Sequence, residues 1–133
     1  MHRKLIAIVF LVVVFSFSAC GFSNYYFTKG NEVFYFTDED GLGEVTFKVE
    51  EVDTASFQIL DDIYAKDGKN VYRVGKIIEG ADPATFEVLS HKAYAKDRFA
   101  VYFWGKKVEG ADPQTFVLID PKHAKDAIHE YSF

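Results

Sequence analysis

The 133-residue sequence contains a single cysteine, Cys20. No intramolecular disulfide can therefore form, and no thiol follows residue 20 that could serve in nucleophilic catalysis or in a structural metal site. Basic residues are also scarce, because 15 Lys and Arg face 20 Asp and Glu and leave a net charge of −5. This acidic balance argues against binding DNA, RNA or anionic lipid through overall charge, so we expect no nucleic-acid partner.

Motifs of common catalytic and phosphate-binding sites are missing as well. The sequence has no G-x-S-x-G segment around a serine nucleophile and no glycine-rich loop of the kind that cradles phosphates. Beyond residue 17, no stretch shows apolar residues at helical spacing over ten residues. We therefore expect a mostly β protein without a cofactor, and we do not expect an enzyme.

The N-terminus has the three parts of a secretory signal peptide, over residues 1–19. The opening MHRK carries two cations, the next 13 residues (5–17) carry no charge, and small residues lead to Cys20. The apolar run is shorter than the ~20 residues that cross a bilayer, which makes an uncleaved transmembrane anchor the weaker interpretation.

The residues FSAC at the end of this segment resemble a bacterial lipobox, in which an apolar residue and two small residues precede the cysteine. The resemblance implies that Cys20 receives a diacylglycerol group and becomes the mature N-terminus, although Phe17 stands where leucine is usual. Cleavage after Ser18, or a spectator thiol at Cys20, are the alternatives. The expected location is the bacterial cell envelope, with the protein anchored to a membrane by lipid and facing away from the cytoplasm.

A 26-residue segment occurs twice with an offset of 30 residues, and 15 of its 26 aligned positions are identical. A fixed period of this length is typical of stacked supersecondary units. A longer first copy and a shortened last copy flank the two full ones, as expected of terminal units that close a stack. The four copies are 26–60, 64–89, 94–119 and 123–133, in a domain 26–133 that follows a short tether, 20–25.

Each full copy contains four short segments of strand-like composition, separated by turn residues. In the first full copy these strands are expected at 64–67, 71–74, 77–78 and 86–89. Gly75-Lys76 is interpreted as a tight hairpin corner, and Asp82 and Pro83 as the N-cap and first residue of a single helical turn. The predicted fold class is a small antiparallel domain of tandem β-hairpin repeats after an N-terminal signal helix.

The second strand of each copy has one face that is apolar or aromatic in every copy, and we expect this face to be the core. It includes Trp104, which is therefore predicted to be buried. The opposite face varies at its second position, where Tyr35, Arg73 and Phe103 occupy equivalent places. We predict that these three side chains form a partner-facing stripe, because aromatic rings and a guanidinium suit a sugar ring or a flat protein surface. The alternative is that Arg73 only covers the two rings.

The segments YAKDGKNVY and GADPATFEVL resemble the DKNYY repeat family, whose members are bacterial secreted or lipoprotein-type proteins built from tandem hairpins of this kind. The resemblance covers most of 64–133 and, weakly, 26–60. The segment 97–103 departs from the motif, since it reads DRFAVYF and lacks the Lys-Asn pair of the turn. The resemblance implies the repeat fold and no particular activity.

Two groups of acidic residues could carry chemistry, and each has a simpler structural interpretation. Asp67, Asp97 and Asp126 recur at strand ends, where turn formation explains them better than a catalytic pair of carboxyl groups does. The segment DEDGLGE, 38–44, resembles part of a calcium loop, but its fifth position is Leu42, which cannot coordinate. An acidic hairpin loop is the favoured interpretation of 38–44.

His123 and His129 flank Asp126 at spacings of three residues, but no further metal ligand lies nearby, so a polar cap of the last copy is expected there. Two functions of different classes remain. The first is a non-catalytic, membrane-tethered binding or structural module for an unidentified protein or glycan. The second is a small envelope enzyme or calcium-dependent module that uses 38–44. Repetition favours the first, because a catalytic site breaks repeat symmetry while a scaffold keeps it.

Overall fold

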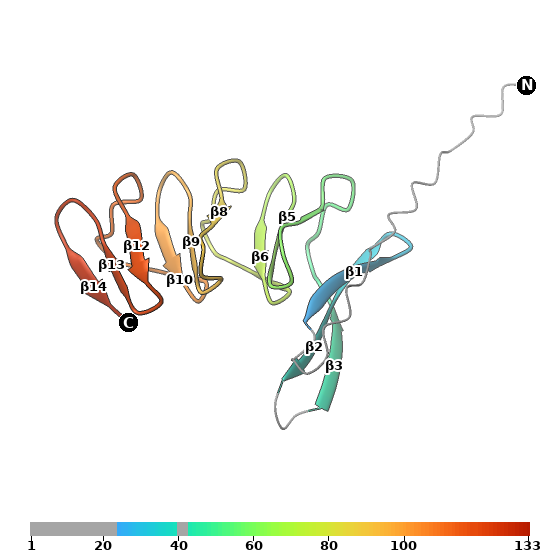
Figure 1. The fold of residues 1–133 in the computed structure, drawn as a ribbon. Helices are drawn as coiled ribbons and strands as arrows, with labels where there is room; N and C mark the ends of the chain where they lie inside the picture. Colours follow the sequence, from blue (N-terminus) through green and yellow to red (C-terminus); the bar gives the residue numbers. More distant parts are fainter. Residues whose placement is uncertain (1–23, 40–42) are drawn as a thin grey trace, which may run out of the picture.

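The computed structural model describes residues 24–39 and 43–133, and this part of the chain contains fourteen β-strands and no helix (Figure 1). The strands form four small antiparallel sheets that follow one another along the chain. The prediction of a mostly β domain of small antiparallel sheets is therefore confirmed. The expected signal helix, 1–19, and Cys20 lie outside the described residues.

The first sheet, of order β1-β2-β3, has the longest strands. They are β1 (Tyr25–Lys29), β2 (Glu32–Glu39) and β3 (Gly43–Lys48). The second sheet consists of β4 (Gln58–Ile59), β5 (Tyr64–Lys66), β6 (Val71–Arg73) and β7 (Lys76–Ile77). The third repeats this design with β8 (Glu87–Val88), β9 (Tyr94–Lys96), β10 (Val101–Phe103) and β11 (Lys106–Lys107). The fourth has three strands, β12 (Val117–Asp120), β13 (His123–Lys125) and β14 (Glu130–Ser132).

The structural unit is offset from the sequence copy by one strand. Strand β8 comes from the end of the first full copy, yet it pairs with β9 of the next copy, with Val88 opposite Ala95. Strands β4 and β12 pair with β5 and β13 in the same manner. Each copy therefore contributes its last strand to the sheet of the following copy, which ties neighbouring sheets together through the chain.

The sheets stack face to face, so that both faces of an interior sheet are covered. Side chains alternate along a strand, and Val71 and Tyr72 of β6 are both fully buried on opposite faces. Tyr72 packs with residues of the first sheet in one apolar cluster, and Val71 packs with residues of the third sheet in another. A third cluster joins the last two sheets, so the core of the described residues is divided among the junctions of the stack.

The predicted division of the second strand into a core face and an outer face is wrong. Tyr35, on the expected outer face, is 0% exposed, whereas Trp104, on the expected core face, is 52% exposed. Stacking explains the first error, because the face of β2 that carries Tyr35 packs against the second sheet. The second arises because β10 ends at Phe103, so that Trp104 lies in the following turn and the alternation of the strand no longer applies.

The last sheet closes the stack with a polar outer face. Ala124 and Tyr131 pack inward against the third sheet. The residues that alternate with them are exposed, namely His123, Lys125, Glu130 and Ser132. A polar outer face on a terminal unit disfavours the stacking of a further unit.

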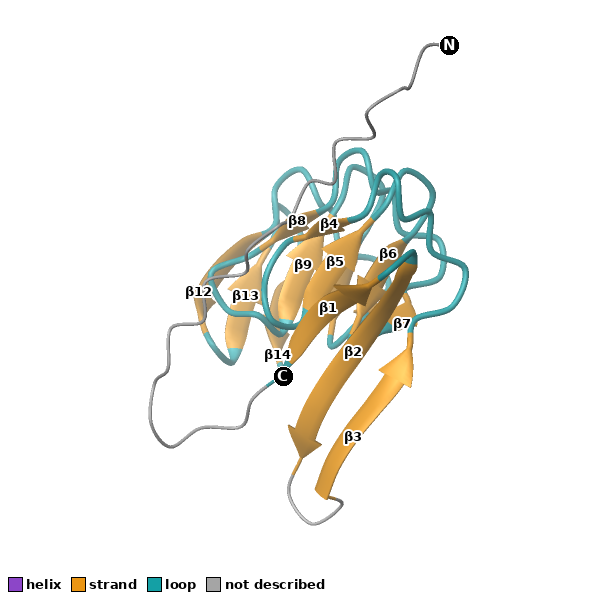
Figure 2. Ribbon diagram, turned by 90° about the vertical axis from the view of Figure 1, so that its right-hand side faces the viewer, coloured by secondary structure: helices purple, strands orange, loops and turns teal. Residues whose placement is uncertain are grey.

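Loops lie along two opposite edges of the stack (Figure 2). We call one the turn edge, defined by the turns 67–70, 97–100 and 126–129. The other is the corner edge, defined by the two-residue hairpin turns Val74-Gly75 and Trp104-Gly105. Strand β2 continues past this edge as far as Glu39, so the β2–β3 hairpin projects beyond it, at the bottom of Figure 2.

Candidate functional site

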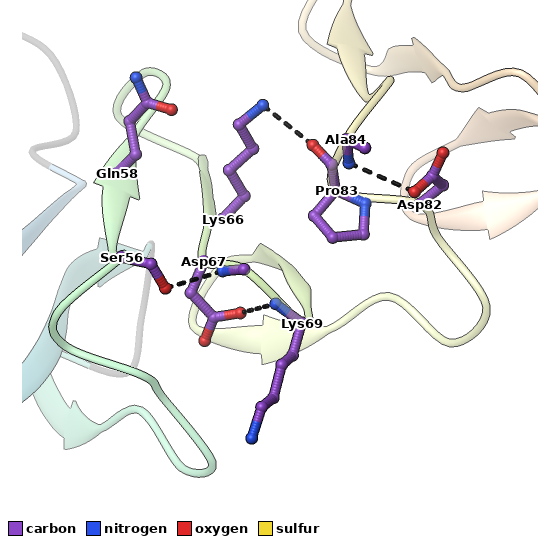
Figure 3. Close-up of a pocket in the computed structure, with 9 residues that line it drawn as sticks. Ser56, Gln58, Lys66, Asp67, Lys69, Asp82, Pro83 and Ala84 are labelled. Atoms are coloured by element: carbon purple, nitrogen blue, oxygen red, sulfur yellow. Dashed lines mark hydrogen bonds between the residues drawn. The ribbon is translucent and has the colours of Figure 1, made fainter.

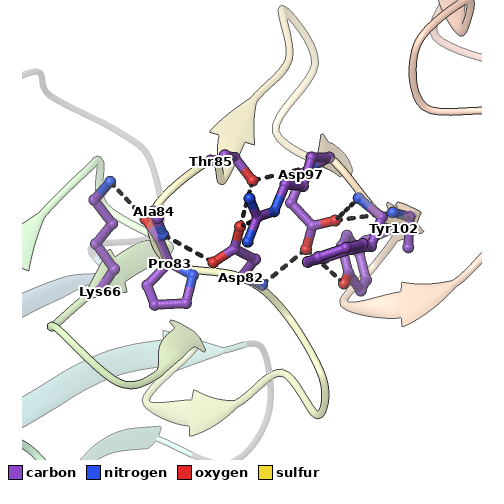
Figure 4. A network of polar contacts seen from close by, with 10 residues as sticks. Lys66, Asp82, Pro83, Ala84, Thr85, Asp97 and Tyr102 are labelled. Carbon is purple, nitrogen blue, oxygen red and sulfur yellow. Dashed lines mark hydrogen bonds and ion pairs between the residues drawn. The ribbon is translucent and has the colours of Figure 1, made fainter.

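The turn edge is built on an aspartate that recurs in three of the four units. In the third sheet, Oδ1 of Asp97 accepts hydrogen bonds from the N–H groups of Phe99 and Ala100, at 2.7 and 2.8 Å. Its Oδ2 accepts one from the N–H of Asp82 and one from the hydroxyl of Tyr102, both at 2.8 Å (Figure 4). One carboxylate thus closes its own turn, holds the tyrosine of the next strand, and fixes the start of the preceding turn.

The same arrangement occurs in three units, and we call it the aspartate clamp. Each clamp pairs an aspartate with the tyrosine five residues later and with a backbone N–H that lies 14 or 15 residues earlier. The three pairs are Asp67 with Tyr72, Asp97 with Tyr102, and Asp126 with Tyr131. The five-residue spacing between Asp and Tyr is visible in the sequence and recurs in three copies. This recurrence indicates a structural pair of residues more directly than a catalytic pair.

A second link joins each capped turn to the clamp that follows. The hydroxyl of Thr85 donates to Oδ2 of Asp82 at 2.8 Å and accepts from the N–H of Arg98 at 3.0 Å. Nε of Arg98 also lies 3.1 Å from Asp82 Oδ2. Ser56 and Thr115 repeat the hydroxyl link in the neighbouring units. The expected helical turn after Asp82 is thus a hydrogen-bonded turn held by its own threonine.

Hydrogen bonding keeps the clamp aspartates ionised. Burial alone would raise the pKa of Asp97, but the N–H of Asp82, the backbone donors of its own turn and the Tyr102 hydroxyl outweigh it and hold this pKa below the usual carboxyl range. Burial first, and the hydrogen bond to Asp97 second, raise the pKa of Tyr102. In the last clamp, the hydrogen bond to Asp126 and burial raise the pKa of Tyr131 to about 12. At neutral pH each aspartate is therefore charged and each tyrosine neutral.

A cleft of about 440 Å³ lies on the turn edge between the second and third sheets (Figure 3). Lys66 spans it and donates from Nζ to the carbonyl oxygen of Pro83 at 2.9 Å. Asp67 and Asp82 also line the cleft, but their oxygens are engaged in the links described above. The side chain of Lys69 forms no hydrogen bond or ion pair with the described residues and points away from Lys66 in Figure 3.

The corner edge carries an exposed aromatic ring, that of Trp104, next to a cation. The guanidinium carbon of Arg73 lies 4.7 Å from the centroid of the Trp104 ring, an arrangement suited to a cation–π interaction. The Trp104 ring meets that of Phe103 edge-on, with centroids 6.1 Å apart. Sequence reasoning missed this exposed tryptophan, although the alignment of Trp104-Gly105 with Val74-Gly75 was a signal for a turn.

The three residues predicted to form a stripe do not share one exposed surface. Tyr35 is buried in the first junction, while Arg73 and Phe103 are half-buried. Each of these three side chains faces the following unit. Arg73, for example, lies close to Gly105 of the next unit, since a Cβ built on this glycine would be 3.1 Å from Cδ of Arg73. Arg73 contacts Trp104, whereas Phe103 packs against Phe133, with ring centroids 4.5 Å apart. The position shared by these three residues is therefore part of the packing between units.

The residues considered for metal binding have other roles in the structure. Nδ1 of His123 lies 2.8 Å from Oδ2 of Asp120, and Asp126 serves its clamp. Asp38 and Glu44 lie opposite each other on β2 and β3, while 40–42 fall outside the described residues. Within the described residues, no group of three or more His, Cys, Asp or Glu is arranged to hold a metal ion.

These features define a class of protein: a stack of small β-sheets whose recurring Asp and Tyr residues hold turns in place. The family model of the DKNYY family matches residues 3–103, and the chain belongs to this family. No curated protein and no solved structure matches the chain. In the described part of the chain, no helix is long and apolar enough to cross a membrane.

Proposed function

We propose that the protein is a non-catalytic, lipid-anchored protein of the bacterial cell envelope, whose β-repeat stack acts as a binding or structural module. The observation that supports this proposal is that the recurring aspartates and tyrosines are engaged in hydrogen bonds within the protein. Each clamp carboxylate already accepts four hydrogen bonds from its own protein, as Asp97 does. A general acid or base must instead reach the proton of a substrate. The recurring aspartates and tyrosines therefore support a scaffold role.

The proposed anchor is a lipid on Cys20, which would hold the stack close to a membrane. Strand β1 begins at Tyr25, and five residues of extended chain reach at most ~18 Å. A single acyl chain binds a bilayer only marginally, so stable attachment needs the two or three chains that such signals specify. The acidic charge supports a lipid anchor over electrostatic attachment, since 20 acidic and 13 basic residues follow Cys20.

Replacement of Cys20 tests this anchor. Cys20→Ser should move the protein from the membrane fraction to the soluble fraction or leave the signal peptide uncleaved, because serine has no thiol to alkylate. The measurement is fractionation by ultracentrifugation, with mass spectrometry of the N-terminal peptide of the wild type. Ser18→Ala serves as a matched control that keeps the thiol. An unmodified N-terminus in the wild type would exclude lipid anchoring.

A second candidate is a calcium-dependent module at the tip of the β2–β3 hairpin. Asp38 and Glu44 are directly opposite each other, and like charges in this arrangement repel. A bound cation would offset this repulsion. If the candidate is right, millimolar calcium should raise the melting temperature by several degrees, and Asp38→Asn with Glu44→Gln should abolish the rise. An unchanged melting temperature with calcium would exclude it.

A further inference from the structure

The turn at Trp104 adopts a conformation that its sequence disfavours. Trp104 and Gly105 have φ values of +50° and +77°, as a two-residue hairpin turn with both residues left-handed requires. Asn or Gly is preferred at the first position, because a side chain with a bulky Cβ substituent is strained there. Strain of this kind persists at positions where another requirement outweighs it, and such positions are frequent at ligand sites.

The equivalent turn in the previous unit provides an internal comparison. Val74 has a φ of +51°, but its side chain packs against the apolar cluster of the first junction, which offsets the strain. Trp104 contacts Phe103 and Arg73, but 52% of its surface is exposed, so packing offsets less of the strain than a buried tryptophan would provide. The placement of a tryptophan here is therefore only partly explained by burial.

A second unfavourable feature lies beside the indole. Arg73 and Lys76 are directly opposite each other on β6 and β7, so both side chains leave the same face of the sheet. This face is turned toward the unit that carries Trp104. Like charges in this arrangement destabilise a hairpin, and neither residue forms an ion pair with the described residues. Nε of Arg73 is buried and has no hydrogen-bond acceptor among them. The polar neighbour of the guanidinium is the hydroxyl of Tyr64, directly opposite on β5: burial raises the pKa of this hydroxyl, and the interaction with Arg73 acts against that rise.

We propose that Arg73, Lys76 and Trp104 form a binding site for an acidic sugar residue of an envelope polysaccharide. The carboxylate or phosphate of the sugar would lie between the guanidinium and the ammonium group, which offer donors within reach of one anion. The C–H face of its ring would lie against the exposed indole, as a flat apolar surface suits an aromatic ring. This inference deepens the proposed binding role by naming the class of partner, and it does not depend on the lipid anchor.

The surroundings favour a polysaccharide over an anionic membrane surface. The β2–β3 hairpin projects beyond the corner edge and carries the exposed residues Asp38 and Glu44 (Figure 1). These carboxylates would be pressed against an anionic bilayer before Trp104 could reach it. A single polysaccharide chain can instead approach the corner edge beside the hairpin. Nucleic acid is disfavoured by the net charge of −5.

The test uses the full chain purified in a neutral detergent, with trigalacturonic acid as the probe and its methyl ester as the uncharged counterpart. Because Trp104 is the only tryptophan, its fluorescence reports binding directly, and calorimetry gives the affinity. Lys76→Gln should weaken binding about tenfold and reduce its salt dependence. Trp104→Asn, which suits the left-handed turn and should fold, should weaken binding about tenfold as measured by calorimetry. Lys69→Gln, at the opposite end of the β5–β6 hairpin, is the matched control and should leave the affinity unchanged.

Equal affinity for the acid and its ester would overturn the proposed anion contact, and equal affinity of Trp104→Asn and wild type would overturn the proposed ring contact. Vesicles containing anionic phospholipid form a further arm. Binding to vesicles but not to the acidic trisaccharide, with the same sensitivity to Lys76→Gln, would replace the sugar by a lipid surface and overturn the proposal. Absence of binding to either probe also overturns this site, whereas only the Cys20→Ser fractionation tests the anchor.

Discussion

At the scale of single residues, the aspartate clamps show how one side chain can organise a repeat. Asp97 presents two oxygens to four donors, and two of these, the N–H of Asp82 and the hydroxyl of Tyr102, come from outside its own turn. Asp97→Asn keeps one oxygen but turns an N–H₂ group toward the N–H of Asp82. We expect a loss of about 2–4 kcal/mol in the free energy of unfolding, because buried donors would lack acceptors.

Asp61 offers the matched control for this substitution. Its Oδ1 alone accepts the N–H groups of Ile63 and Tyr64, so an asparagine can replace it with one oxygen. Asp61→Asn should cost less than about 1 kcal/mol by the same denaturant titration. Similar losses in the two variants would show that the clamps contribute no more than ordinary turn caps.

The clamps also predict how stability depends on pH. The pKa values of Asp67 and Asp97 are lower in the folded protein than in an unfolded chain. Their contribution is therefore complete above the range in which an unfolded aspartate titrates, and it is lost as the pH falls below about 4. The melting temperature should drop in this acidic range, and the drop should be smaller in Asp97→Asn. A melting temperature that stays constant down to pH 2 would contradict the assignment.

At the scale of elements, the hairpin corners hold neighbouring sheets close together. A Cβ built on Gly75 would lie 2.5 Å from Cε2 of Phe47, and the φ of Gly75 is +69°. Gly75→Ala should therefore combine a steric clash with an unfavourable backbone conformation and cost about 3–4 kcal/mol. Gly30 has a similar φ of +63° but no atom within 4 Å of its built Cβ. Gly30→Ala should cost only about 1 kcal/mol, as measured by thermal or denaturant unfolding.

The sequence was sufficient to predict the hairpins but not the way in which they assemble. Turn residues such as Gly68 and Gly75 mark the ends of β5, β6 and β7, and their positions agree with the expected strands within a residue or two. The transfer of β8 to the next sheet was not predictable, because the two residues Glu87–Val88 are too few to show an alternation. The long-range hydrogen bond from Asp82 to Asp97 spans that connection, and only the folded chain reveals it.

The candidate site illustrates a related limit. Arg73 was identified from its slot in the repeat, but its role depended on what faced it across the junction. Trp104 lies about 30 residues after Arg73 in the sequence. Only the stacking of the sheets brings the centroid of its ring to 4.7 Å from the guanidinium carbon. Trp104 was assigned to the core because strand alternation was applied one residue too far, beyond the end of β10.

At the scale of the whole molecule, the stack has a defined end. The outer face of the fourth sheet pairs Lys125 with Glu130 and His123 with Ser132 across β13 and β14. In the third sheet, the residues equivalent to Glu130 and Ser132 are Val101 and Phe103, which pack against the next unit. Two polar side chains thus occupy the places through which an interior sheet would contact its neighbour.

Restoring the interior pattern at these two places should remove the end of the stack. Glu130→Val with Ser132→Phe would create an apolar outer face, and contact through such a face to a different surface of another copy does not close on itself. We expect concentration-dependent oligomers, detected by light scattering of the detergent-solubilised protein against the wild type at the same concentration. Glu130→Gln with Ser132→Thr keeps the face polar and should not change the mass. If the apolar variant stays at the wild-type mass while remaining folded by circular dichroism, the polar residues of the last sheet are not what ends the stack.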